Sequence, residues 1–179
     1  MEDPVRDAPP AIAAIHHLTL PVDDLEVAER FYVGALGLPL VRRIDEATFR
    51  RLRPERAAEV DLDADDSPLH LQLRCGDVEL DLFLRRAPID APLRAHPHLA
   101  LSIAPQALAP FKERLTALGV PVDGPRRLGP PGHASIYFAD PFGNLLELCT
   151  MGYEGPLEIG APAVAGLGYR FAASPEVTS

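Results

Sequence analysis

Apolar and polar residues alternate with a period of two in two stretches that resemble each other. Residues 17–22 read His-Leu-Thr-Leu-Pro-Val, and residues 98–103, 81 positions later, read His-Leu-Ala-Leu-Ser-Ile. Such alternation predicts β-strands that bury one face. Because an internal repeat constrains the whole architecture, the pattern indicates a fold that is built twice.

Each of these strands is followed by a segment with helical periodicity that ends on Ala-Leu-Gly. The first helix is expected at 24–36 and the second at 106–118, with Gly37 and Gly119 as C′ caps. Asp23 is the predicted N-cap of the first helix, and Glu26 completes a capping box. The apolar residues of each helix form one stripe that should lie on a sheet: Leu25, Ala28, Tyr32, Ala35 and Leu36 in the first, and Leu108, Phe111, Leu115 and Leu118 in the second.

Further strands are expected at 38–44, 69–74 and 78–84 in the first half, and at 120–127, 134–139 and 145–150 in the second. The last two flank Asp-Pro-Phe-Gly-Asn at 140–144, a strong turn sequence. The order of elements is therefore βαβββ, twice. It predicts an α+β fold in which two βαβββ modules form a cupped, barrel-like mixed sheet.

The length of 179 residues and the hydrophobic fraction of 47% fit one domain with a real core. We place that domain at 12–150, with module one at about 12–86 and module two at about 94–150. Residues 1–11 are expected to form an N-terminal arm, and 151–179 a tail, a lid or a dimer arm. Residues 46–68 are an insertion peculiar to the first half, predicted as a short helix or an exposed loop that could overhang a site.

Charge and composition narrow the classes of partner. The 17 Lys and Arg against 26 Asp and Glu give a net charge of −9, which argues against nucleic acid. No stretch of eighteen uncharged apolar residues is present, so we expect no membrane partner and a soluble, cytoplasmic protein. Cys75 and Cys149 lack CxxC spacing and are expected to be small buried residues, without a disulfide framework or a zinc ribbon.

The strand alternation also places candidate metal ligands. Leucines on one face of each strand should pack on the helices, which turns His17, His98 and Glu147 to the opposite face. If the modules close on one another, two imidazoles and a carboxylate converge, a set that binds Fe, Mn, Ni, Co or Zn with open coordination positions. Each residue alone would more often be an ordinary strand residue, but the matched repeat positions favour a site for one divalent metal ion.

At this point the sequence resembles the vicinal oxygen chelate superfamily, which includes glyoxalase I, type I extradiol dioxygenases, fosfomycin-resistance enzymes and bleomycin-binding proteins. The supporting stretches are 17–25, Phe31-Tyr32, 36–38, 98–101 and, most specific, 135–148. The resemblance implies paired βαβββ modules around a metal held by His17, His98 and Glu147. It also implies that the metal acts as a Lewis acid on vicinal oxygens of a substrate.

The resemblance, the strand alternation and the repeat together suggest roles for further residues. Asp81, in Leu-Asp-Leu at 80–82, matches Glu147 in Leu-Glu-Leu at 146–148 and is a candidate fourth ligand or proton-moving base. Tyr137 is a second catalytic candidate, and Thr19, Glu79 and Ser135 are candidates for substrate binding. The arginine pairs 42–43 and 126–127 are candidates for anion binding, although arginines are more commonly charged residues exposed at the surface. His16, His70 and His96 receive no role.

These observations predict a metal-dependent enzyme on a small oxygen-rich molecule, closest to glyoxalase I-like isomerase or lyase chemistry. An extradiol-type dioxygenase and an antibiotic-resistance or ligand-sequestering protein remain as alternatives. A small-molecule substrate and a homodimer are the expected partners.

Overall fold

The computed structural model describes residues 15–60, 66–85, 98–159 and 162. The first module contains β1 (His17–Val22), α1 (Leu25–Glu29), the π-helical turn η1 (Arg30–Ala35), β2 (Leu40–Ile44), β3 (Asp66–Cys75) and β4 (Val78–Arg85). The insertion between β2 and β3 forms α2 (Glu46–Leu52) and the 3-10 helix η2 (Pro54–Glu59). The second module contains η3 (Pro105–Ala107), α3 (Leu108–Ala117) and the strands β5 (Leu99–Ser102), β6 (Asp123–Arg127), β7 (Ala134–Ala139), β8 (Leu145–Thr150) and β9 (Glu158–Ile159).

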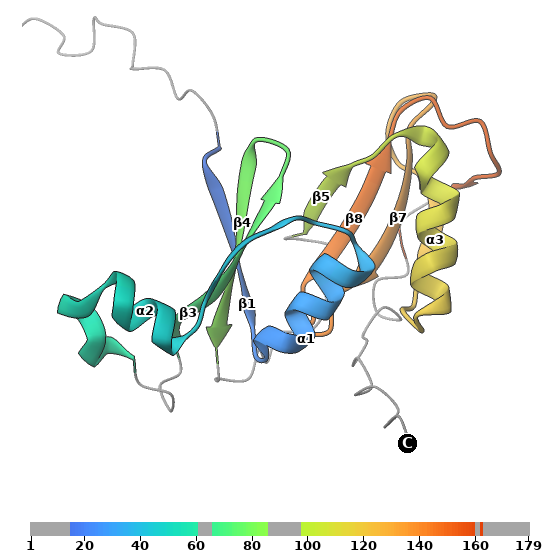
Figure 1. Cartoon of the computed structure of the whole chain (residues 1–179). Coiled ribbons are helices and arrows are strands. Elements are labelled where there is room, and N and C mark those ends of the chain that lie inside the picture. The colour runs from blue at the N-terminus through green and yellow to red at the C-terminus, as the bar shows by residue number, and fades with distance from the viewer. Residues whose placement is uncertain (1–14, 61–65, 86–97, 160–161, 163–179) are drawn as a thin grey trace, which may run out of the picture.

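The strands form two mixed sheets, in the orders β1-β4-β3-β2 and β5-β8-β7-β6-β9 (Figure 1). In each sheet the first strand of its module pairs in parallel with the last strand of the βαβββ unit, β1 with β4 and β5 with β8. The α+β fold of two βαβββ modules is thus confirmed. One part of that prediction needs correction: the two sheets are not closed into a barrel, since no strand pairing joins them among the described residues.

The ends of the helices follow local chemistry. The first helix is capped by Asp24, and not by Asp23 as predicted, because the Asp24 carboxylate accepts hydrogen bonds from the backbone N–H groups of Glu26 and Val27. After Glu29 the helix widens, and Leu36 N–H donates to Phe31 C=O at 3.0 Å. Gly37 and Gly119 have φ of 75° and 78°, the left-handed conformation expected of C′ caps.

The structure assigns secondary structure to parts of two segments whose structure the sequence left undecided, 46–68 and 151–179. The insertion forms α2 and η2, with Asp45 capping α2 through Thr48 N–H. Part of the predicted C-terminal segment is sheet, because β9 pairs with β6. Of the predicted segment 151–179, the structure describes only residues 151–159 and 162. The predicted arm 1–11 lies outside the described residues. In the described part of the chain, no helix has both the length and the apolar character needed to cross a membrane.

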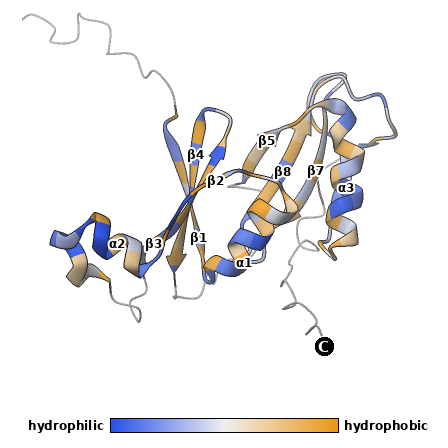
Figure 2. Ribbon diagram, viewed as in Figure 1, coloured by the Kyte–Doolittle hydropathy of each residue, from blue (hydrophilic) through white to orange (hydrophobic). Residues whose placement is uncertain are grey.

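One hydrophobic core joins the two modules. The core-facing residues of the sheets are Leu71, Leu73, Leu80 and Leu82 in the first, and Ile136, Phe138, Leu146 and Leu148 in the second. Helices α1 and α3 carry both hydrophobic and hydrophilic residues (Figure 2), and the predicted stripe of the first helix is buried throughout. In the second helix Leu118 is 42% exposed, contrary to its predicted place in the stripe. Cys75 and Cys149 are free thiols and only half-buried, not buried as expected.

A buried polar network also ties the modules together. The Tyr32 hydroxyl donates to Asp140 Oδ2 at 2.7 Å, across 108 positions of sequence. The same carboxylate accepts from the backbone N–H groups of Phe142 and Asn144 and from Asn144 Nδ2. Asn144 Nδ2 in turn donates to Pro21 C=O at 3.0 Å. The turn at 140–144 is therefore one point at which the second module is held to β1 and η1 of the first.

Burial shifts the pKa values of this network. It raises the pKa of Tyr32 well above its usual value, and the neighbouring Asp140 charge adds to the effect, so the hydroxyl remains a donor. Burial also raises the pKa of Asp140 to about 6, although its hydrogen bonds with Asn144, Tyr32 and Phe142 oppose the shift.

We predict that Tyr32→Phe lowers the free energy of unfolding by about 1–3 kcal/mol, because it leaves the buried Asp140 carboxylate without one donor. Urea unfolding at pH 7, monitored by circular dichroism, measures the change. Tyr153→Phe is the matched control, since Tyr153 is partly buried but makes no side-chain hydrogen bond in the described structure. Equal effects of the two substitutions would contradict the structural role of the network.

The pKa of Asp140 predicts a pH dependence. The folded state holds this proton up to about pH 6, whereas an unfolded Asp releases it near 3.8. The stability from this group is thus full below about pH 4 and lost as pH rises through 6, by a few kcal/mol. Wild-type stability relative to Asp140→Asn should therefore fall between pH 4 and 6.5 in urea unfolding. A difference that stays constant over this range would show that Asp140 titrates normally.

Candidate metal centre

Strand register decides which side chains share a face. Leu18, Leu20 and Val22 of β1 alternate with His17 and Thr19, which pair in register with Glu79 and Asp81 of β4. In the second sheet Ala100 pairs with Glu147, and Glu147 pairs on its other side with Tyr137. Since the leucine-bearing face of each sheet packs into the core, the polar residues occupy the opposite face. Asp81 and Glu147 therefore hold equivalent positions in the two modules, as the repeat predicts.

The second sheet assembles a compact polar cluster. His98 Nε2 lies 2.9 Å from Glu147 Oε2, and the Glu147 side chain is buried. The other carboxylate oxygen, Oε1, accepts from the Ser135 hydroxyl at 2.5 Å and from the Tyr137 hydroxyl at 3.2 Å. The rings of His98 and Tyr137 are perpendicular, with centroids 6.3 Å apart. The structure thus brings together His98, Ser135, Tyr137 and Glu147.

His133 extends this cluster. Its Nδ1 accepts from the backbone N–H of Gly129 at 3.2 Å, so the proton of the neutral ring is assigned to Nε2. Nε2 lies 3.3 Å from the Ser135 hydroxyl and can donate to it, while Ser135 donates to Glu147. Hydrogen bonds thus run in one direction from His133 to the carboxylate. The alternation of β7 places Ser135 and Tyr137 on this face, but His133 precedes the strand, and sequence alone gives it no place here.

Tyr137 stays protonated in this setting. Its burial first, and then the charge of Glu147, raise its pKa to about 12. The hydroxyl is consequently a hydrogen-bond donor to the carboxylate over the whole neutral range. Ser135 and Tyr137 together fix the orientation of Glu147, which leaves Oε2 directed at His98.

The first sheet assembles a second, separate group. Asp81 is buried, and its Oδ1 has no hydrogen-bond partner. Burial first, and then Glu79, raise the pKa of Asp81, while His70, His17 and His16 act in the opposite direction. Glu79 accepts from Gln72 Nε2 at 3.2 Å and has Arg74 at 3.7 Å. A buried carboxylate oxygen without a donor is costly, so the side chain is suited to receive a proton or a cation.

His17 and Thr19 are exposed at the rim of this group. His17 Nδ1 lies 3.0 Å from Nδ1 of His16, a residue to which the sequence assigned no role. His70 is a further missed residue: with Gln72, it shares the face that carries Asp81, because both alternate with the core leucines of β3. That alternation was visible in the sequence, although no matching histidine in the second module drew attention to it.

The two groups do not meet within one chain. Among the residues that the structure describes, no three His, Cys, Asp or Glu side chains lie close enough together to hold a metal ion. The spacing of His98 and Glu147 in the second sheet is nevertheless compatible with a metal ion. Two ligand atoms at about 2.1 Å from one ion and at right angles to each other are roughly 3 Å apart, close to the 2.9 Å between His98 Nε2 and Glu147 Oε2. The spacing of His98 and Glu147 is compatible with two ligands of one ion, and such a site would need at least one more ligand.

Comparison with known proteins defines the family. Residues 14–148 match the Glyoxalase/Bleomycin resistance protein/Dioxygenase superfamily. This match covers both modules, all the strands from β1 to β7 and most of β8. The chain therefore belongs to this superfamily, the vicinal oxygen chelate proteins.

Individual relatives share 20–27% sequence identity with this chain. The chain is 27% identical over 139 residues to the glutathione transferase FosA of Serratia marcescens, covering 76% of this chain and 80% of FosA. The fosfomycin resistance protein FosX of Listeria monocytogenes, solved with Mn(II) and sulfate, shares the fold with a TM-score of 0.56 and 20% identity, over 78% of this chain and 93% of FosX. A putative glyoxalase family protein from Bacillus anthracis has a TM-score of 0.56 and 20% identity, over 80% and 99% of the two chains.

The position of Asp81 generates a prediction. Asp81→Asn should keep the fold, because it removes a buried charge without changing the shape of the side chain. It should lower metal affinity or activity by about 10–100-fold, the usual scale for groups that ligate or orient a ligand. Metal titration and circular dichroism measure the two properties, and Asp77→Asn, in the turn before β4, is the control. Unchanged affinity and activity in Asp81→Asn would remove Asp81 from the site.

Proposed function

We propose that this protein is a divalent-metal-dependent enzyme that acts on a small oxygen-rich molecule, with glyoxalase I-like isomerase or lyase chemistry. The observation that supports this proposal most strongly is the contact between His98 and Glu147, in which Ser135 and Tyr137 orient the carboxylate. His98, Glu147 and His17 are the proposed ligands. The bound ion, of the group Fe, Mn, Ni, Co and Zn, would supply a Lewis acid for the substrate oxygens.

The residues around the proposed ligands have distinct tasks. Ser135 and Tyr137 donate to Glu147 Oε1, which limits the rotation of the carboxylate and keeps Oε2 available beside His98. Asp81 is the proposed proton acceptor, because its buried Oδ1 lacks a donor. Thr19 and Glu79, which pair in register with Asp81 and His17, are the proposed substrate contacts on the same sheet.

We further propose that a second copy of the chain completes the site. His17 lies on the first sheet and the His98–Glu147 pair on the second, and they do not cluster within one chain. β1 and β5, which carry or adjoin the two histidines, are both edge strands. Leu18 of β1 is 36% exposed, and Ala100 of β5 is also exposed. In a two-fold dimer, the first sheet of one copy would face the second sheet of the other and give two identical sites.

A fosfomycin-modifying resistance enzyme is the second candidate. The sequence match to FosA, which spans both modules, favours it. The FosX structures contain Mn(II) with sulfate or with a dihydroxypropylphosphonic acid, and these ligands are compatible with the same kind of metal centre. Against it, the sequence has no Lys or Arg from 148 to 169, so a cation for the phosphonate would have to come from elsewhere.

Metal content and variant mixing test the proposal. Protein purified without a histidine tag should hold one ion per chain, and His17→Ala, His98→Ala and Glu147→Gln should each lose it. Mixing refolded His17→Ala with Glu147→Gln should restore about a quarter of the sites, because half of the dimers are mixed and each mixed dimer has one complete site. His70→Ala is the control that should keep its metal. Elemental analysis and activity on 2-oxoaldehyde–thiol adducts and on fosfomycin are the readouts.

The outcomes separate the alternatives. Full occupancy in any two of the three ligand variants would contradict the ligand assignment. Loss in each variant without recovery on mixing would place all ligands in one chain and reject the shared site. Iron with O₂ consumption would favour a dioxygenase, and a metal-free protein that binds a ligand without turnover would favour sequestration.

A further inference from the structure

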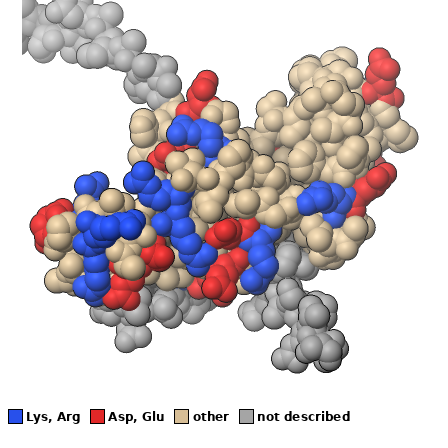
Figure 3. Space-filling view, in the orientation of Figure 1, with Lys and Arg blue, Asp and Glu red and all other residues tan. Residues whose placement is uncertain are grey.

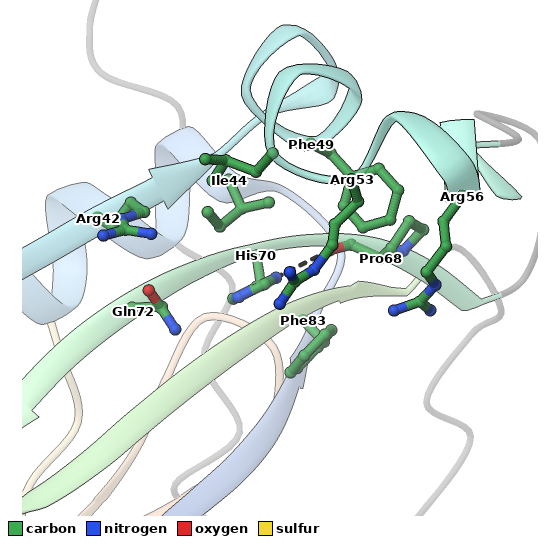
Figure 4. A pocket seen from close by; sticks show the side chains of 10 residues that line it. Arg42, Ile44, Phe49, Arg53, Arg56, Pro68, His70, Gln72 and Phe83 are labelled. Atoms are coloured by element: carbon green, nitrogen blue, oxygen red, sulfur yellow. Dashed lines mark hydrogen bonds between the residues drawn. The ribbon is translucent and has the colours of Figure 1, made fainter. Parts of the chain in front are cut away.

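The insertion encloses a pocket that neither the ligand assignment nor the family match explains. It has a volume of about 460 Å³ and lies between α2, η2 and the face of β2, β3 and β4 (Figure 4). The volume is within the range of small-molecule sites. In Figure 4, the Arg53 side chain lies over His70 and Phe83, and Phe49 of α2 and Pro68 form part of the wall.

The pocket lies on the same sheet face as the Asp81 group. Phe83, which lines it, is two residues after Asp81 on β4, roughly 7 Å along the strand and on the same face. Gln72, which also lines it, pairs directly with Asp81 across β3 and β4. A small molecule in the pocket would therefore extend toward Asp81 and, beyond it, His17.

The charge of the pocket is positive. Among the residues that the structure describes, its lining includes three arginines, Arg42, Arg53 and Arg56, and no Asp or Glu. This concentration stands out in a chain with a net charge of −9. Figure 3 shows blue Lys and Arg atoms gathered over α2 and the neighbouring strand. Glu79 and Asp81 of β4 do not line the pocket, and Glu79 is already engaged by Gln72 and Arg74. Guanidinium groups in such a setting favour a carboxylate, phosphate or phosphonate.

The wall of the pocket is flat and apolar. The His70 and Phe83 rings stack with centroids 4.4 Å apart and an angle of 21°. His70 Nδ1 lies 2.8 Å from Pro68 C=O, which can only accept, so Nδ1 is the donor of this contact. The Arg56 guanidinium sits 5.7 Å from the centre of the Phe49 ring. The pocket thus combines a cationic rim with a slot for a planar or aliphatic group.

We propose that this pocket binds the anionic end of a small organic acid, with its apolar body against His70 and Phe83. The substrate of the metal centre is then an organic anion, and the insertion selects it. This role of the insertion in selecting the substrate rests on the proposed function, whereas anion binding by the pocket does not require a metal. The same arginines supply the cation that is missing after Glu147.

Phenylphosphonate and its neutral dimethyl ester are suitable probes, titrated into the full-length protein by calorimetry, with the metal loaded and after chelation. Phenylphosphonate should bind at least about tenfold more tightly than the ester, and Arg53→Ala and Arg56→Ala should each weaken it about tenfold. Arg51→Ala, which removes the same charge from α2 outside the pocket, should change the affinity less than twofold. Because Arg56 packs on Phe49, Arg56→Lys serves as a second variant that keeps the charge and should retain part of the binding.

Equal affinities for the two probes, or equal losses in Arg51→Ala and Arg53→Ala, would overturn the pocket assignment. If the protein holds its metal and turns over a substrate while Arg53→Ala leaves phenylphosphonate affinity unchanged, the pocket proposal fails alone. If phenylphosphonate binding depends on Arg53 and Arg56 but the protein holds no metal, the proposed function fails and the anion site stands.

Discussion

The hydrogen bond from Tyr32 to Asp140 is the contact on which the arrangement of the modules depends. Each sheet could form from local pairing, but their relative position needs contacts between distant parts of the chain. Asp140 gathers three donor residues, Tyr32, Phe142 and Asn144, and Asn144 reaches back to β1 through Pro21. The Arg114 guanidinium adds two bonds from α3 to the carbonyls of Gly34 and Ala35. These polar contacts specify how the shared apolar core is closed, because misplacing the modules would leave buried polar groups unpaired.

This arrangement also explains why the proposed metal ligands form two groups. The leucine-bearing faces of both sheets are committed to the core with the helices. The histidines therefore lie on the opposite face of each sheet. Because the core occupies one face of each sheet, it keeps the two histidine-bearing faces apart. The proposed site, which draws on both modules, would then need two chains. Duplication of a βαβββ unit supplies matching halves, and association of copies can bring unlike halves together.

Much of the fold could be predicted from the sequence because the same pattern of strands and helix occurs in both halves of the chain. The alternation of leucines fixed the register of β1, β4, β5 and β8, and with it the faces of Asp81 and Glu147. Where two adjacent aspartates compete for one cap, as Asp23 and Asp24 do, local pattern could not choose between them. Barrel closure was wrong because it depends on long-range packing that strand periodicity does not encode. His133 was missed because its contact with Ser135 appears only in the tertiary structure. The face of His70 could be predicted from the alternation of β3, but its stacking on Phe83 could not.

The insertion after β2 affects more than the size of the molecule. A cup made from two like modules would offer the two ends of a bound molecule nearly the same surroundings. α2 and η2 are present in the first module alone, and they place arginines and stacked rings at one end. In the dimer proposed above, the other end would face the second sheet of the partner copy, which carries Ser135 and Tyr137. A molecule bound between such different walls would have a single orientation, so one of its two prochiral faces would be turned to the reacting groups.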